Sequence, residues 1–131
     1  FHKNLKKTCD SYKKGCYKKF KKWCDEYFYL PHRNESRGLG GIFYDYLNTK
    51  EWDKDFVFTK NVGLTFIQTY LEIIELTAKN DWNENDKAKQ LFRRSRYVEF
   101  NLLHDRGTKF GLMTNGNTEA ILMSLPPLAS W

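Results

Sequence analysis

One apolar stripe near the start of the chain constrains the fold more than any other feature. Its members recur at steps of three and four residues: Leu5, Cys9, Tyr12, Cys16, Phe20, Trp23 and Tyr27. Residues at these steps lie above one another on an α-helix, so the stripe predicts helical structure with this face turned toward a core. Gly15 interrupts the pattern, which predicts two helices, near residues 3–12 and 17–29.

The lysines of the same segment allow two interpretations. Residues 1–24 contain nine Lys and one Asp, a balance of +8, whereas the remaining residues have a balance of −2. A basic block interleaved with aromatic residues is typical of a nucleic-acid surface. The helical spacing instead turns the rings inward and leaves the lysines in water, and electrostatic attraction alone carries no sequence specificity. We therefore predict a solvated helix face and no nucleic-acid partner.

Length and composition indicate one domain or part of one. The 131 residues are 40% apolar and 17% aromatic, which excludes intrinsic disorder, and no apolar run is long enough for a transmembrane segment. The three cysteines, at spacings of seven and eight, match no CxxC pattern and are predicted to be buried thiols in a reducing compartment. Phe1 stands where a Met would begin a protein, so we expect an N-terminal part to be missing.

The rest of the chain predicts an α+β fold. Pro31 is expected to end the second helix, before a polar loop over residues 31–41. The period is helical over residues 51–79 and 84–95 and changes to two from Tyr97 onward. The predicted strands are residues 42–47, 97–104, 109–114 and 118–125, with turns at 105–108 and 115–117. A meander of antiparallel strands would thus follow a helix-rich first half.

The loop over residues 32–41 carries the clearest sign of chemistry. Its glycines precede a predicted strand, so it is not a dinucleotide-binding fingerprint. Gly40 and Gly41 would let the backbone approach a bulky ligand closely. Arg33 and Arg37 offer planar forks that grip carboxylates with two hydrogen bonds each. The loop is either a pocket for a polyanionic organic acid or a turn with two solvated arginines.

Other polar residues give weaker indications. Three arginines lie near the end of the shorter predicted helix, where cations complement the helix dipole: Arg93, Arg94 and Arg96. His2 and His32 are candidate metal ligands, although no carboxylate partner lies at a fixed spacing and arginines beside His32 would repel a cation. His104, on an apolar strand face, is predicted to be a core histidine. No catalytic triad or phosphate loop is present, so the residues alone predict an anion-binding module.

Three ordered blocks resemble the oxygen-dependent coproporphyrinogen III oxidases of haem biosynthesis. They comprise residues 20–28 with 32–33 and 37–45, residues 96–112, and residues 118–126. The resemblance implies that residues 1–131 are the C-terminal portion of a single domain, an antiparallel sheet flanked by helices. It implies conversion of two propionates of coproporphyrinogen III to vinyl groups, giving protoporphyrinogen IX, with O₂ as co-substrate. It implies no organic cofactor, a doubtful need for a divalent metal, and a homodimer formed through the segment from Tyr97 onward.

The resemblance also assigns roles to individual residues. It places the substrate-binding positions at Arg33, Arg37, Gly40, Gly41, Asn115, Gly116 and Asn117. His2 and His32 match histidines proposed as metal ligands, and no catalytic residue lies within this segment. Members of the family work in the cytoplasm, mitochondrion or plastid, and the sequence does not choose between these compartments.

Two departures from the family pattern leave an alternative open. Asn117 stands where the family has an arginine, and the loss of one charge-assisted contact would cost about 1.5–3 kcal/mol of substrate binding. The family's N-terminal half is also absent, so we expect this segment alone to be inactive. The alternative is a non-catalytic, truncated relative that serves as a structural subunit of a larger assembly.

Overall fold

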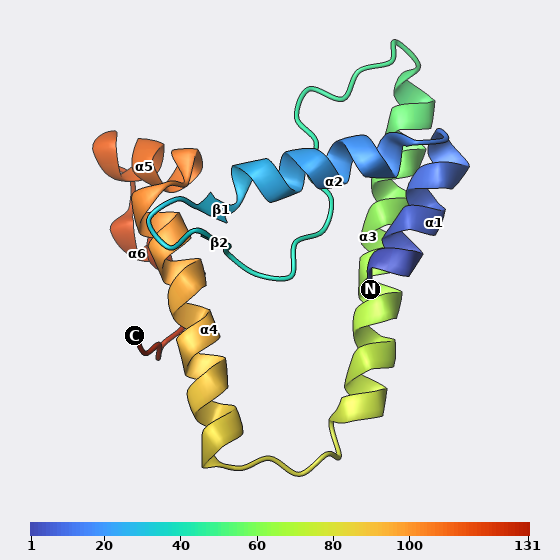
Figure 1. The fold of residues 1–131 in the computed structure, drawn as a ribbon. Helices are drawn as coiled ribbons and strands as arrows, with labels where there is room; N and C mark the ends of the chain where they lie inside the picture. The colour runs from blue at the N-terminus through green and yellow to red at the C-terminus, as the bar shows by residue number, and fades with distance from the viewer. The chain divides into compact units, whose positions relative to one another are not determined.

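A computed structural model describes residues 1–131 and is mostly helical (Figure 1). The helices are α1 (His2–Tyr12), α2 (Cys16–Tyr27), α3 (Trp52–Thr77), α4 (Glu84–Leu103), α5 (Arg106–Met113) and α6 (Thr118–Leu122). Two short strands, β1 (Tyr29–Leu30) and β2 (Glu35–Ser36), pair antiparallel, with Leu30 opposite Glu35. The class is α+β, as predicted. The chain forms two compact units: a first unit of residues 1–27 and 40–81, and a second unit of residues 28–39 and 82–131.

The apolar stripe organises the first unit as its spacing predicts. Gly15, at a φ of +84°, separates α1 from α2. Cys9, Cys16 and Phe20 from the stripe are buried together with Phe58 of α3. α1 lies along α3 (Figure 1), and side-chain hydrogen bonds join the two helices at Thr8 and Thr65, 2.7 Å apart. The prediction that the stripe faces a core is therefore confirmed for most members, although Trp23 remains 40% exposed.

The three cysteines are buried thiols, as predicted. Cys16 Sγ donates a hydrogen bond to the Cys9 carbonyl at 3.0 Å. Burial, reinforced by the neighbouring Cys16, raises the pKa of Cys9 to about 12. Because the thiolate is the reactive form of cysteine, Cys9 behaves as an inert apolar residue.

The strand predicted at residues 42–47 is wrong. The segment is a coil that packs against helices: Phe43 N donates to the Phe20 carbonyl at 3.1 Å, and the Tyr44 and Phe20 rings lie 4.9 Å apart. Its aromatic composition correctly indicated burial. The aromatic side chains of this segment pack against helical side chains and not against neighbouring strands. One backbone hydrogen bond joins the segment to α2.

The long helix predicted over residues 51–79 is confirmed as α3. It contacts α1 through Phe58, Thr65 and Thr69, whereas most of its other apolar side chains are exposed. None of the helices combines the length and the apolar character needed to cross a membrane.

In the second unit, the helix predicted to end at residue 95 continues to Leu103, so the strand predicted at 97–104 is wrong. A capping box at Asn83 and Asp86 starts α4 firmly. Its buried residues, Ser95, Arg96, Glu99 and Phe100, recur at helical steps. Val98 and Leu102, which gave the alternation of a strand, are also four residues apart and equally compatible with a helix.

The later strands predicted at 109–114 and 118–125 are also wrong, because short helices occupy these positions. Asp105, predicted to lie in a hairpin turn, caps α5: its Oδ2 accepts from Thr108 N at 2.7 Å. The turn at 115–117 is confirmed, with Asn115 at a φ of +57° and Gly116 N donating to the Gly111 carbonyl at 2.9 Å. A Cβ on Gly116 would lie 2.9 Å from that carbonyl oxygen, so α5 and α6 need glycine there.

Candidate functional site

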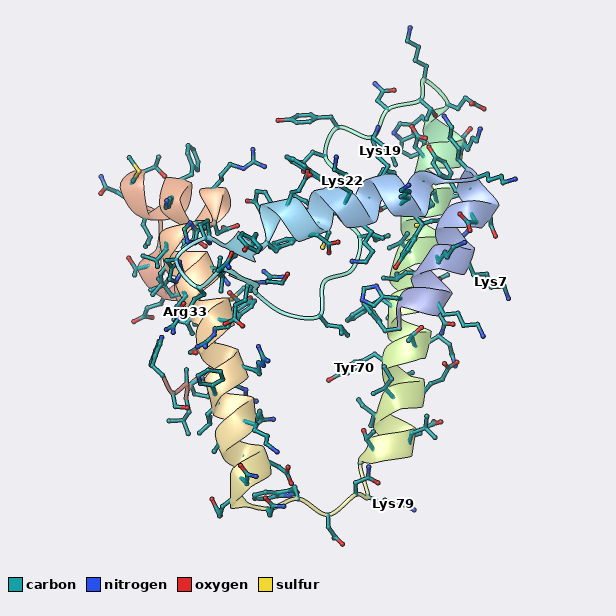
Figure 2. All side chains as sticks on the ribbon, in the orientation of Figure 1. Lys7, Lys19, Lys22, Arg33, Tyr70 and Lys79 are labelled. Atoms are coloured by element: carbon teal, nitrogen blue, oxygen red, sulfur yellow. The ribbon has the colours of Figure 1, made fainter.

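The first part of the predicted anion-binding loop forms the turn and second strand of the β1–β2 hairpin in the second unit. Pro31 begins the turn between the strands, and Asn34 completes it at a φ of +54°. Arg33 N donates a hydrogen bond to the Leu30 carbonyl at 3.1 Å, and Arg37 N donates one to the Phe28 carbonyl at 3.0 Å. Leu30 is fully buried and anchors the hairpin, so the polar side chains of the turn are held at defined positions. Figure 2 shows Arg33 beside α4.

Glu99 of α4 is the polar centre of this site. Its side chain is only 8% exposed and accepts two hydrogen bonds from the Arg33 guanidinium, at 3.0 Å from Nε and 2.7 Å from Nη2. His32 Nε2 and Trp131 Nε1 donate to the same carboxylate, each at 2.7 Å. The Arg33 fork, with help from His32 and Trp131, lowers the pKa of Glu99 to about 2 despite its burial. Glu99 is therefore an anion at any physiological pH.

A second ion pair joins the hairpin to α4 with the charges reversed. Arg96, whose side chain is 4% exposed, donates from Nε to Glu35 Oε1 at 2.5 Å. Its Nη1 donates to Ser95 Oγ at 2.8 Å, and its guanidinium carbon lies 3.8 Å from the centre of the Phe92 ring. The Arg96 hydrogen bond lowers the pKa of Glu35. The arginines predicted to lie at a helix end thus lie within α4, and the buried one binds a carboxylate instead of a helix dipole.

Arg37 lies against aromatic rings of the second unit. Its guanidinium carbon is 3.9 Å from the centre of the Phe28 ring, 5.1 Å from that of Phe100 and 5.4 Å from that of Tyr97. A guanidinium stacked on a ring is stabilised by the negative ring face, while its N–H donors point outward in its own plane. The aromatic rings therefore help to hold the Arg37 cation in place.

His32 also contacts His104, which is not on a strand as predicted but caps the C-terminus of α4. His104 Nε2 and His32 Nδ1 are 3.2 Å apart, and the two rings stack with their centres 5.3 Å apart. His32 Nε2 donates to Glu99, so Nδ1 is the nitrogen available to His104. Neither Glu99 nor His104 was predicted from the sequence to be a partner of the loop. The signal that could have revealed Glu99 is its position three residues after Arg96 on one helix face.

The structure contains no group of three or more His, Cys, Asp or Glu side chains suited to holding a metal ion. His2, the other predicted ligand, belongs to the first unit, where its Nδ1 lies 3.1 Å from the Tyr17 hydroxyl oxygen. The metal role of His2 and His32 stays a prediction.

Gly40 and Gly41 belong to the first unit, and only Gly40 has a local structural reason to be glycine. Gly40 has a φ of +73°, and a Cβ there would lie 3.2 Å from Asp25 Oδ1. Gly41 is buried, but an added Cβ would make only ordinary van der Waals contact with the Phe1 ring, at 3.7 Å. Close approach of a ligand to these glycines also stays a prediction.

Asn117, in the predicted substrate-binding turn, is the N-cap of α6. Its Oδ1 accepts a hydrogen bond from Ala120 N at 3.2 Å. This amide therefore has a local structural role that the arginine expected at this position would not provide, since arginine has no acceptor atom.

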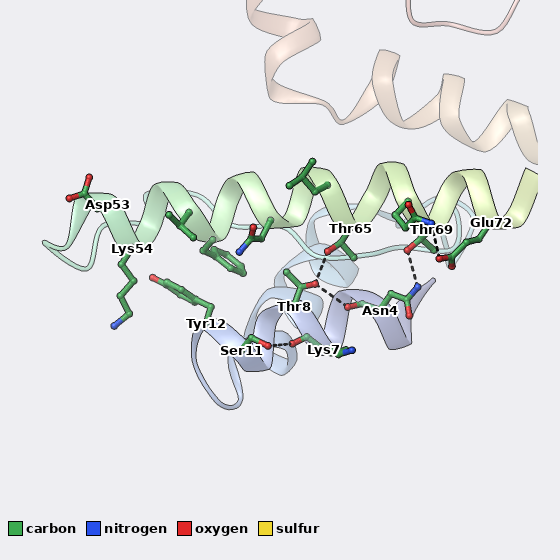
Figure 3. A pocket seen from close by; sticks show the side chains of 15 residues that line it. Asn4, Lys7, Thr8, Ser11, Tyr12, Asp53, Lys54, Thr65, Thr69 and Glu72 are labelled. Carbon is green, nitrogen blue, oxygen red and sulfur yellow. Dashed lines mark hydrogen bonds between the residues drawn. The ribbon is translucent and has the colours of Figure 1, made fainter.

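The first unit has a groove of about 900 Å³ along α1 and α3 (Figure 3). Asn4 Nδ2 donates to Thr69 Oγ1 at 3.0 Å beneath it, and Tyr12 and Lys54 lie at one end. Its polar groups are largely engaged with each other, and none of the predicted site residues lines it.

Comparisons with known proteins bear on the whole chain. Residues 1–131 match the family model described as coproporphyrinogen III oxidase. The oxygen-dependent coproporphyrinogen-III oxidase of Rickettsia bellii (strain OSU 85-389) is 60% identical over 131 residues, which are 100% of this chain and 47% of that protein. The proteins of the same name from Rickettsia akari (strain Hartford) and Rickettsia rickettsii (strain Sheila Smith) are each 61% identical over 127 residues, 97% of this chain and 46% of theirs. The chain spans about half the length of the curated relatives it matches.

Proposed function

This chain belongs to the coproporphyrinogen III oxidase family, and from that premise we propose that it is the C-terminal part of an oxygen-dependent coproporphyrinogen III oxidase. The complete protein would use O₂ to decarboxylate two propionates of coproporphyrinogen III oxidatively, giving protoporphyrinogen IX for haem synthesis. The observation that carries the proposal is that the family model covers residues 1–131, with 60% identity to a relative of that name.

Within this function, we assign the direct recognition of a substrate propionate to Arg37. Two features support this role: a guanidinium fork matches the geometry of a carboxylate, and the Phe28 ring, 3.9 Å from the guanidinium carbon, holds the side chain in place. Arg33 has a different role, since its fork already grips Glu99. It would hold the hairpin in place and add positive charge near the substrate. Gly40, Gly41 and the 115–117 turn complete the proposed contacts.

The remaining properties of the complete enzyme are proposals of the same kind. We propose a homodimer formed through the segment from Tyr97 onward, which is helical here. We also propose the family's antiparallel sheet flanked by helices, with its strands supplied mainly by the rest of the polypeptide. A reducing compartment fits the three buried thiols.

The test uses a single polypeptide in which the half missing relative to the Rickettsia bellii relative precedes Phe1. With coproporphyrinogen III in air, we expect this protein to form protoporphyrinogen IX, and the 131-residue segment to be inactive. Arg37→Ala should lower kcat/KM at least about tenfold, and Arg37→Lys should restore part of it, since one lost charge-assisted contact exceeds 1.4 kcal/mol. Lys79→Ala, at an exposed position, is the control. A complete protein that neither binds nor oxidises the porphyrinogen would refute the proposal.

Asn117 favours a second candidate, a non-catalytic structural subunit. The amide caps α6 and supplies no guanidinium to a substrate. A subunit of this kind should co-purify at fixed stoichiometry with other chains, and Asn117→Arg should not increase its activity. An active complete protein whose substrate affinity rises with Asn117→Arg would contradict this candidate.

A further inference from the structure

Helix α3 leaves a long apolar surface exposed. It exposes eleven large apolar residues, more than the eight apolar residues that the whole chain buries. Five of the eleven form what we term the outer face of α3 and lie away from the groove along α1: Phe56, Ile67, Tyr70, Leu71 and Ile74. Each is between 40% and 56% exposed. Apolar surfaces of this extent are uncommon on complete soluble domains and usually mark an interaction site.

The outer face lies on the side of α3 opposite α1. Phe58, Thr65 and Thr69 form the inner side, where they contact α1. Phe56 and Ile67 lie about half a turn away from them. Steps of three, four and seven residues connect Ile67 with Tyr70, Leu71 and Ile74, and Phe56 lies eleven residues, about three turns, before Ile67. Figure 2 shows Tyr70 extending from α3 on the side away from α1. These exposed residues therefore share one side of the helix.

The charges of α3 argue against a lipid surface as the partner. The helix contains Lys54 and Lys60 against four acidic residues, a balance of −2. A helix that lies on a membrane is typically rich in Lys and Arg along the borders of its apolar face. Protein is therefore the better candidate for the partner.

The length of the relatives indicates which protein segment covers this face. The chain accounts for 47% of the Rickettsia bellii relative, so slightly more than half of that polypeptide lies outside the match; we call it the complementary half. The first unit buries only a small cluster around Cys9, Phe20 and Phe58, as expected where a larger core has been divided. We propose that the outer face of α3 is the surface on which the complementary half docks.

A two-polypeptide experiment tests this inference. The chain is co-expressed with the tagged complementary half of the Rickettsia bellii relative, and their association is measured by co-purification and titration. Ile67→Asp places a charge in the centre of the outer face, whereas Asn61→Asp places the same charge on the groove side of the same helix. We expect the first variant to weaken association at least tenfold and the second less than twofold, with unchanged helix content by circular dichroism. Equal association of both variants would overturn the inference.

A second measurement covers the case in which separate halves do not fold. In the single polypeptide with the complementary half before Phe1, Ile67→Cys should react with iodoacetamide at least tenfold more slowly than Asn61→Cys. Equal reactivity would show that the outer face remains in water and would overturn the inference. So would a homodimer of the isolated chain that Ile67→Asp dissociates, because the occupant would then be a second copy.

The inference rests on family membership and not on the catalytic proposal. Association and labelling are read without substrate. Docking without porphyrinogen turnover would therefore refute the proposed activity alone, whereas turnover with an exposed outer face would refute only the docking.

Discussion

Replacing Glu99 with Gln should release the hairpin that carries Arg33 and Arg37. The carboxylate accepts four hydrogen bonds, two from Arg33 and one each from His32 and Trp131. Glutamine keeps one carbonyl oxygen and replaces the other with an NH₂ group that faces existing donors. The variant therefore loses the negative charge and about half of the acceptor capacity at a nearly buried position.

The pKa of Glu99 sets the size of the effect. A fall from the usual 4.5 to about 2 corresponds to at most about 3.4 kcal/mol of stabilisation. Arg33 and His32 are each more than a third exposed, so water screens part of this interaction. We therefore expect Glu99→Gln to reduce the free energy of unfolding by about 2 kcal/mol near neutral pH.

The pH dependence gives an independent check of the same interaction. The folded-state pKa of Glu99 is depressed, so its stabilisation is fully present above about pH 4.5 and is lost as the pH falls toward 2. The difference in unfolding free energy between the wild type and Glu99→Gln should therefore shrink over this range.

Urea unfolding followed by far-UV circular dichroism measures the global effect. Hydrogen exchange of the Arg37 amide, which donates to the Phe28 carbonyl, reports on the hairpin itself. Glu26→Gln is the control, because Glu26 is more than half exposed and lies 3.6 Å from Lys22 in a surface pair. The reasoning fails if both variants lose the same small amount, or if the effect of Glu99→Gln is independent of pH.

Three further outcomes are expected from single positions. Asn83→Ala removes the capping box of α4 and should cost about 1 kcal/mol of unfolding free energy, and Asn83→Asp, which keeps an acceptor, should cost less. Gly116→Ala should cost about 1–3 kcal/mol because the added methyl group meets the Gly111 carbonyl; normal stability by urea unfolding would contradict the close approach of α5 and α6. Cys9, with its pKa raised to about 12, should resist alkylation in the native protein at about pH 8 and react only after unfolding, as mass spectrometry would show.

The helices of the first 80 residues were predictable because local spacing specifies them, whereas the segment 42–47 was wrongly predicted as a strand. The stripe from Leu5 to Phe20 and the long pattern of α3 each repeat over several turns, so the helical period is unambiguous. The region after Tyr97 was misread because its apolar residues satisfy two periods at once. Helix was favoured there by features outside the alternation, namely the caps at Asn83, Asp105 and Asn117.

The arginines of the candidate site could be predicted from the sequence, but the residues that they contact could not. Arg33 and Arg37 lie in one hairpin of the second unit, as the loop suggested. The partners of Arg33 lie 66 residues away in sequence on α4, and no local spacing indicates such a contact. The sequence therefore identified the guanidinium groups, while only the fold shows that one grips a carboxylate and the other stacks on rings.

The two reversed ion pairs between the hairpin and α4 also fix the alignment of these elements. Arg33 binds Glu99 and Glu35 binds Arg96, so positive and negative groups alternate on both surfaces one helical turn apart. A slip of the hairpin by one turn along α4 would place Arg33 against Arg96, two like charges where one of them is buried. The two ion pairs therefore favour one alignment of the hairpin along α4 over the alignment shifted by one helical turn.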